Sequence, residues 1–142
     1  MQLRDVFIEK WHRCRDHRYP VMLIIPSQAG LVPDTFIDEA AGIMEGKSID
    51  FAARYQGALE TFLTWGGVHT ELRVLSSSTP IVVSNLEPFY SKWPIAERMD
   101  FLRYILRTEL ANGIVIILYC QENLADIRSI EENSRGAIWA LS

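Results

Sequence analysis

The chain has 142 residues, of which 49% are hydrophobic and 23% are charged, and its formal net charge is −4. This size and balance are typical of one globular domain, 1–142, with a sizeable core. The negative charge argues against a general nucleic-acid coat. The longest apolar runs, 21–25 and 114–120, are too short to cross a bilayer as helices, and the N-terminus does not resemble a signal peptide. We therefore expect a cytoplasmic protein with no membrane partner.

The first third of the chain predicts a helix, a buried strand and a second helix. Apolar residues recur at three- and four-residue spacing over 3–17, and Pro20 ends that helix. The continuously apolar run 21–25 predicts a central strand covered on both faces. A turn over 26–33 leads to a helix that begins near Asp34, where acidic residues suit the positive end of a helix.

The middle of the chain has weaker patterns. Apolar residues alternate over 49–55, which predicts a short strand. Residues 58–65 predict a helix that the pair Gly66 and Gly67 ends. Residues 70–75 fit either a short helix or a strand.

The second half alternates strands and helices. The pattern predicts strands at 80–84, 113–120 and 137–141, an amphipathic helix at 96–110 and a shorter helix at 122–131. Apolar strands joined by helices are typical of βαβ units with parallel strands. The fold class predicted is α/β, a three-layer sandwich with a mostly parallel central sheet of four or five strands, similar to P-loop NTPases.

The loop after the first strand has the position of a phosphate-binding loop, because open parallel sheets bind ligands at the carboxyl ends of their strands. The candidate nucleotide-binding residues are Ser27, Gln28, Ala29 and Gly30. The loop has no lysine to neutralise phosphate, and Pro33 removes one amide donor. We expect a degenerate phosphate loop.

Two further candidates follow later strands. Glu87 either reaches the ligand crevice or caps a turn before Pro88, and Gln121 either senses a γ-phosphate or lies in a surface loop. Ser84 stands where a magnesium-binding aspartate is expected. No cofactor is required by this pattern, although ATP with magnesium stays an open alternative. The histidines and cysteines have no metal-ligand spacing, so no metal site is predicted.

The segment from Gly42 to Ser48 is similar to a phosphate loop but has one residue too few between its glycines. It also follows a helix instead of a strand. We interpret it as a chance match.

Aromatic and basic residues supply the candidate interaction surfaces. A proline-bounded aromatic segment either anchors an interface or covers the sheet edge, and a basic N-terminal cluster around Lys10 is either a solvated helix face or a contact for phosphate or an acidic partner. Two other arginines are either arginine fingers toward a neighbour or a helix-dipole partner and a turn residue. The aromatic candidates are Phe89, Tyr90 and Trp93, and the basic N-terminal candidates are Arg13, Arg15 and Arg18. The two other arginines are Arg107 and Arg135.

From residue 79 to 118 the chain resembles the small P-loop-like proteins of bacterial BREX anti-phage systems, the BrxF family. The matching residues are 84–87, Phe89, 101–106 and 114–118. The resemblance implies the fold and a setting in a defence system. It does not carry over ATP hydrolysis, because the loop 26–33 is not matched residue by residue and Ser84 replaces the family's aspartate.

These patterns favour a non-catalytic, degenerate P-loop-like accessory or assembly subunit of a bacterial multiprotein system, with other protein subunits as partners and a homo-oligomer also compatible. A weak NTPase or nucleotide sensor is the first alternative. The second is a nucleic-acid adaptor that uses the basic N-terminal helix.

Overall fold

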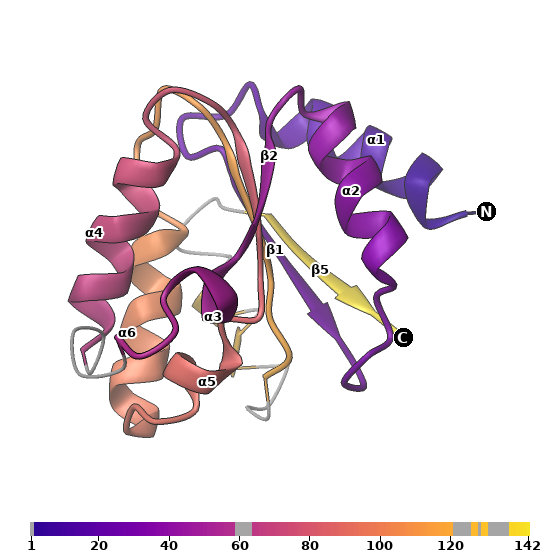
Figure 1. Ribbon diagram of the computed structural model, residues 1–142. Helices are drawn as coiled ribbons and strands as arrows, with labels where there is room; N and C mark the ends of the chain where they lie inside the picture. Colours follow the sequence, from indigo (N-terminus) through magenta and orange to yellow (C-terminus); the bar gives the residue numbers. More distant parts are fainter. Residues whose placement is uncertain (1, 59–63, 121–125, 128, 131–136) are drawn as a thin grey trace.

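A five-stranded parallel sheet forms the centre of the molecule (Figure 1). The computed structural model describes the chain except residues 1, 59–63, 121–125, 128 and 131–136. The strand order is β2-β3-β4-β1-β5, and every neighbouring pair is parallel. The strands are β1 (Val21–Pro26), β2 (Lys47–Asp50), β3 (Ile81–Ser84), β4 (Ile114–Ile117) and β5 (Ala137–Leu141).

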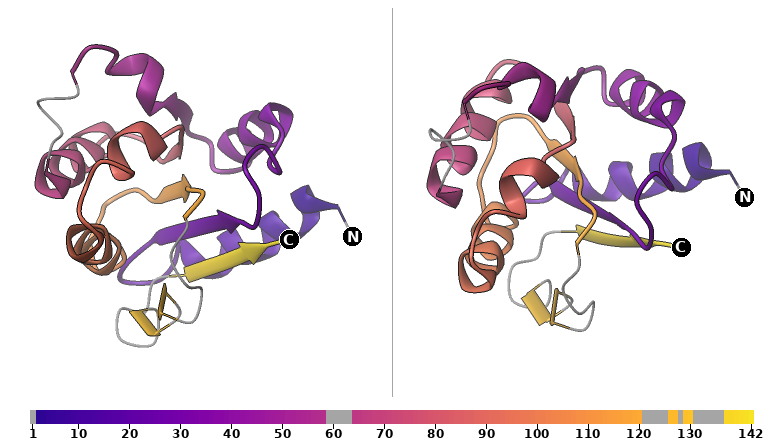
Figure 2. Two further views of the ribbon diagram at one scale, coloured as in Figure 1. Left: turned by 90° about the horizontal axis from the view of Figure 1, so that it is seen from below. Right: turned by 60° about the horizontal axis from the view of Figure 1, so that its bottom comes forward.

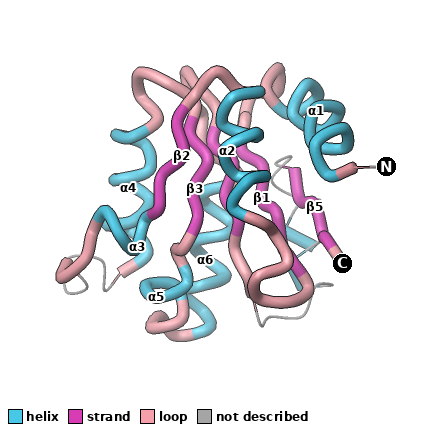
Figure 3. Tube along the Cα trace, turned by 45° about the vertical axis from the view of Figure 1, so that its right-hand side comes forward, coloured by secondary structure: helices cyan, strands magenta, loops and turns pink. Residues whose placement is uncertain are grey.

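Helices cover both faces of this sheet. Figure 2 shows the sheet between two helical layers, and Figure 3 shows α3 and α5 near the ends of β2 and β3. One layer contains α1 and α2, and the other contains α4 and α6. The helices are α1 (Leu3–Cys14), α2 (Asp34–Ile43), α3 (Phe51–Arg54), α4 (Trp65–Leu75), α5 (Glu87–Tyr90) and α6 (Ile95–Ile105). The α/β sandwich predicted from the sequence is therefore confirmed, with all five described strands parallel.

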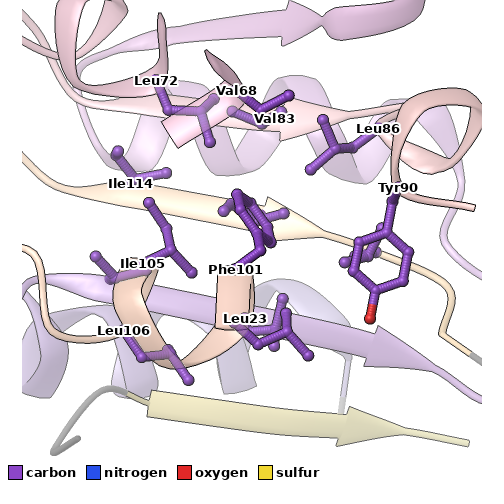
Figure 4. Packing of buried hydrophobic residues seen from close by; sticks show 14 of the residues in the cluster. Leu23, Val68, Leu72, Val83, Leu86, Tyr90, Phe101, Ile105, Leu106 and Ile114 are labelled. Carbon is purple, nitrogen blue, oxygen red and sulfur yellow. The ribbon is translucent and has the colours of Figure 1, made fainter. Parts of the chain in front are cut away.

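The buried strand β1 supplies both layers of the core. Val21, Leu23 and Ile25 pack toward α4 and α6, whereas Met22 and Ile24 pack toward α1 and α2. This alternation follows from the two-residue period of a strand. On the side of α4 and α6 the aromatic ring of Phe101 points from α6 toward the sheet, with Tyr90 to one side of it (Figure 4). Two apolar clusters thus hold the sheet from opposite faces.

The strand predicted over 49–55 is wrong in its second half. β2 ends at Asp50, and α3 begins at Phe51. The carboxylate of Asp50 accepts a hydrogen bond from the amide of Ala53 at 3.1 Å, which caps the new helix. The local cap therefore outweighs the alternating pattern.

The predicted break at Gly66 and Gly67 is also wrong, because both glycines lie in the first turn of α4. The amides of a first turn have no partner within the helix, so glycine weakens it less there than in the interior. Val68 and Leu72 are buried on one face of α4, so residues 70–75 are helical. Most of the helix predicted at 58–65 lies outside the described residues.

The remaining elements are confirmed with shorter bounds. α1 ends at Cys14, α6 ends at Ile105 and β4 ends at Ile117. The last strand occupies its predicted residues. The helix predicted at 122–131 falls largely outside the described residues, although Ile127 and Ile130 are buried in the α6-side cluster. Within the described part of the chain, no helix is long and apolar enough to span a membrane.

Candidate functional site

The connections leave the sheet on opposite faces where β1 and β4 lie side by side. β1 leads to α2 on one face, whereas Ile127 and Ile130, which follow β4 in the chain, are buried in the cluster on the other face. The amide of Leu118 donates to the carbonyl of Ile24 at 3.0 Å, so the two strands end together. Open parallel sheets bind ligands at such a point. We call residues 27–33, 84–87 and 118–120 the switch-point site.

The loop that follows β1 uses part of its backbone for internal contacts. The amide of Ser27 donates to the carbonyl of Leu141 at 2.8 Å, and the amide of Leu31 donates to the carbonyl of Gln28 at 3.3 Å. Gly30 adopts φ +78°, which permits this turn. Pro33 has no amide hydrogen. The exposed residues 27–30 therefore form a tight turn in which the amide of Ser27 is directed to β5 instead of a ligand.

The helix that starts beyond this loop carries a negative charge in its first turn. Pro33 is the N-cap of α2 and offers no side-chain cap, and Asp34 is the first helical residue. Residues 26–33 contain no lysine or arginine. A helix N-terminus attracts anions through its dipole. Here an anion would meet the exposed carboxylate of Asp34 without a cationic side chain from the loop.

Glu87 reaches across from α5 to the end of β4. Its Oε1 accepts a hydrogen bond from the amide of Tyr119 at 3.1 Å, and its side chain is half-buried. The carboxylate therefore lies at the switch-point site and satisfies a strand-end amide there. Ser84, buried at the end of β3, supplies no carboxylate beside it.

Sequence reasoning missed a polar pair at the same edge of the sheet. Asp50 lies opposite Ser84 in the register of β2 and β3, and its Oδ2 accepts from the amide group of Asn85 at 3.0 Å. Asn85 adopts φ +56°, which a short polar side chain tolerates. Because Asp50 also caps α3, both of its oxygens are engaged. The sequence signal for this pair was Asp50 itself, because an aspartate three residues before the amide of Ala53 is typical of a helix N-cap.

Other candidates are placed apart or cannot be placed. Gln121 and Arg135 lie outside the described residues. Arg107 is exposed just after α6. Among the residues that the structure describes, no group of three or more histidine, cysteine, aspartate or glutamate side chains could hold a metal ion.

The aromatic segment is part of the core, so its rings are not the exposed interface anchors that the sequence left open. Phe89, Tyr90 and Trp93 are 4%, 2% and 1% exposed. The ring centroid of Trp93 lies 5.3 Å from that of Phe101, and Phe89 meets Phe51 edge-on at 5.2 Å. Leu86 and the three rings recur at helical spacing, which predicts a buried helix face. That periodicity was the available signal.

The basic N-terminal cluster is exposed, and its arginines lie beside acids. Arg13 pairs with Glu9 at 2.5 Å and Arg15 lies 3.8 Å from Asp16. Arg18 pairs with Glu109 of the loop that follows α6. Exposed ion pairs of this kind contribute about 0–1 kcal/mol each. Their acidic partners reduce the local positive charge that a phosphate would meet.

Lys10 of the same helix is held differently. Its ammonium lies 5.7 Å from the ring centroid of Trp139 in β5, in a cation–π contact that joins α1 to the sheet. The side chain is half-buried. This placement supports a packing role for Lys10.

The segment from Gly42 to Ser48 lies at the amino ends of the strands, whereas the switch-point site lies at their carboxyl ends. It runs from the end of α2 into the start of β2. The strand-loop-helix order that a phosphate loop needs is therefore absent there. The chance match inferred from the sequence agrees with this placement.

A shallow hollow of about 310 Å³ lies between α3 and α5, next to the end of β3. Tyr55, Gly57, Phe89 and Lys92 are among its lining residues. Lys92 is the basic residue of this lining, and it is exposed. The hollow has the size of a small-ligand site but lies outside the switch-point site.

Neither cysteine forms a disulfide. Burial raises the pKa of Cys14 to about 12, so its thiol stays protonated and unreactive. Cys120 is half-buried at the end of β4. Cys14 ends α1, whereas Cys120 follows β4, which ends at Ile117 instead of continuing to Cys120 as the sequence predicted.

Comparisons with protein-family models and with curated proteins find no match to this chain.

Proposed function

We propose that this chain is a non-catalytic, degenerate P-loop-like subunit that works through contacts with other proteins in a bacterial multiprotein system, such as an anti-phage defence complex. The observation that carries this proposal is the switch-point site itself. The place for a phosphate has a carboxylate at the start of α2, a Ser27 amide already bonded to β5 and no cationic side chain in the loop. The resemblance to the BrxF family supports the defence setting.

The magnitudes favour this reading. The dipole of a helix N-terminus attracts a nearby anion by about 0.3–1 kcal/mol. Two like charges about 4 Å apart repel by about 1 kcal/mol in water and about 4 kcal/mol near a protein surface. A phosphate about 4 Å from the Asp34 carboxylate would therefore be repelled at least as strongly as the α2 dipole attracts it. A triphosphate would need a cation from elsewhere.

Nucleotide binding is tested by thermal unfolding of the intact chain with and without Mg-ATP. We expect no change in Tm, whereas a ligand present at 100 times its Kd would add about 2.7 kcal/mol of stability. The variant Asp34→Asn, which removes the repelling carboxylate, is expected to gain weak binding of ATP. Asp38→Asn on the same helix is the matched control and is expected to gain none.

The alternative nucleotide sensor is favoured by one observation, the carboxylate of Glu87 at the end of β4. If Mg-ATP stabilises the wild-type chain and Glu87→Gln abolishes that effect, the chain is a nucleotide sensor. The proposal that its switch-point site does not bind nucleotide is then wrong. Glu87→Gln keeps an oxygen for the Tyr119 amide, so its fold is expected to persist.

The assembly role is tested by isolating the tagged chain from its native host at native expression levels. We expect it to elute with other protein subunits at fixed stoichiometry, with or without Mg-ATP. Elution of the chain by itself, without any partner subunit, would contradict an assembly role.

A further inference from the structure

β5 is the last strand of the sheet on the side of β1. Its register with β1 runs from Met22 opposite Ala137 to Pro26 opposite Leu141. Among the described elements, β1 is the one that β5 contacts extensively, and Figure 2 shows β5 as the outermost strand beside it. The strand contains no charged residue and no proline. It is therefore an apolar edge strand.

The hydrogen bonds of the sheet show which backbone groups of β5 point outward. The carbonyl of Leu141 accepts from the amide of Ser27, so Leu141 faces β1. Orientation alternates along a strand, so Trp139 and Ala137 also face β1. The amides and carbonyls of Ile138 and Ala140 then point away from it. Among the described residues, no backbone hydrogen bond outside the sheet ladder uses either of them.

The opposite edge of the sheet differs from β5 in its protection against pairing. β2 has four residues, and Lys47 and Asp50 are charged. The chain turns into α3 directly after Asp50. Short length, charges and an abrupt exit are the devices that prevent edge strands from pairing with another chain. β5 has neither charges nor proline at its edge.

The outward groups of β5 alternate donor and acceptor at the spacing of a β-strand, so an extended backbone matches them. A second copy of β5 carries the same unsatisfied groups, and a twofold axis satisfies both edges at once. We propose that two copies of this chain pair their β5 strands antiparallel, about a twofold axis at Trp139, and so join their sheets into one. This inference does not depend on the nucleotide site.

The register centred on Trp139 uses every outward group within the strand. Ile138 of each copy lies opposite Ala140 of the other, and each such pair exchanges two hydrogen bonds. The two Trp139 residues face each other as the pair without hydrogen bonds, on the face covered by α1 and α2. No charged side chain of β5 lies at the axis, so the net charge of each copy does not oppose pairing within the strand.

The dimer is tested by sedimentation of the intact chain over a range of concentrations, with one variant for each edge. Ala140→Pro removes an outward amide of β5 and leaves the ladder with β1 intact, because that amide points away from β1. Ser48→Pro is the matched control on β2. Its amide also points outward, because the neighbouring Lys47 amide donates inward to the carbonyl of Pro80. Circular dichroism confirms that each variant is folded.

We expect wild-type and Ser48→Pro chains to form dimers and Ala140→Pro chains to stay monomeric at the same concentration. A wild-type chain that stays monomeric up to about 1 mM would overturn the proposal. A dimer that survives in folded Ala140→Pro or is lost in folded Ser48→Pro would also overturn it.

Amide hydrogen exchange of the wild-type chain provides a second measurement that needs no variant. We expect the amides of Ile138 and Ala140 to become protected as concentration rises, whereas that of Trp139, bonded to β1, is protected throughout. Protection of Ile138 and Ala140 at a concentration where the chain sediments as a monomer would show cover from within the chain and overturn the proposal. Rapid exchange at every concentration would overturn it as well.

Discussion

At the scale of single residues, Gly46 shows how closely two backbones approach at the start of the sheet. A Cβ added to Gly46 would lie 2.0 Å from the carbonyl oxygen of Pro80. That carbonyl accepts a hydrogen bond from the amide of Lys47 at 3.0 Å, so it cannot move without disturbing the entry into β2. Gly42, one turn earlier in α2, has no atom within 4 Å of such a Cβ.

These two glycines predict opposite effects of the same substitution. Gly46→Ala is expected to lower the free energy of unfolding by about 1–3 kcal/mol, because the added methyl group overpacks against backbone. Gly42→Ala is expected to raise it by about 0.5–1 kcal/mol, because alanine favours the helix. Urea unfolding of both variants measures the difference. If both substitutions change the free energy of unfolding by the same amount, Gly46 does not approach the Pro80 carbonyl as closely as described.

At the scale of elements, two kinds of contact join α4 to α6 and the residues after it: a stacked pair of aromatic rings and a hydrogen-bonded histidine. The ring of Trp65 stacks on that of Tyr104 with centroids 5.0 Å apart. Nε2 of His69 lies 2.8 Å from the hydroxyl of Thr108, and that hydroxyl donates to the carbonyl of Tyr104 at 2.8 Å. Because the hydroxyl hydrogen is used, Nε2 must be the donor to Thr108. The Nε2–H group of the imidazole therefore completes this network.

The partial burial of this imidazole predicts that stability depends on pH through His69. Burial lowers the pKa of His69 below its ordinary value of 6.5, and the nearby charge of Arg73 lowers it further. The unfolded chain therefore binds this proton more tightly, so the stability present above pH 6.5 falls as the pH drops through the folded-state pKa. Urea midpoints measured on both sides of pH 6.5 test this. The matched variant His69→Gln is expected to have a shallower dependence, and an unchanged one would exclude His69 as the cause.

At the scale of the whole molecule, the distribution of charge opposes a nucleic-acid role. The net charge is −4, and the exposed arginines of the N-terminal cluster lie beside Glu9, Asp16 and Glu109. Strong binding to DNA requires several basic groups that neutralise phosphates together. The adaptor alternative therefore has the least support from the arrangement of charges.

We expect the intact chain to bind duplex DNA more weakly than about 10⁻⁴ M at physiological salt. Fluorescence anisotropy over a range of salt concentrations measures this, and a matched comparison uses the double variant Arg13→Gln with Arg15→Gln. Tight binding that weakens steeply with salt and is lost in the double variant would support the adaptor instead.

The patterns with one dominant physical cause were predictable from the sequence. Continuously apolar runs predicted β1 and β4, because strands covered on both faces need apolar side chains throughout. The positions of the candidate loop at 27–30 and of Glu87 were predictable too, since they follow the apolar strands β1 and β3. The aromatic segment was harder, because its helical spacing competes with the prolines on both sides. Its burial depends on Phe101, which lies on another helix.

The sequence by itself determined the class of the fold and the absence of a basic side chain from the first loop, because apolar periodicity and residue type are local properties. The strand order was decided only by the tertiary structure, which brings Asp50 beside Ser84 and Glu87 beside Tyr119. It also decided that the amide of Ser27 bonds β5 instead of facing a ligand. These contacts join residues far apart in the chain, and their energies depend on packing that no local pattern records.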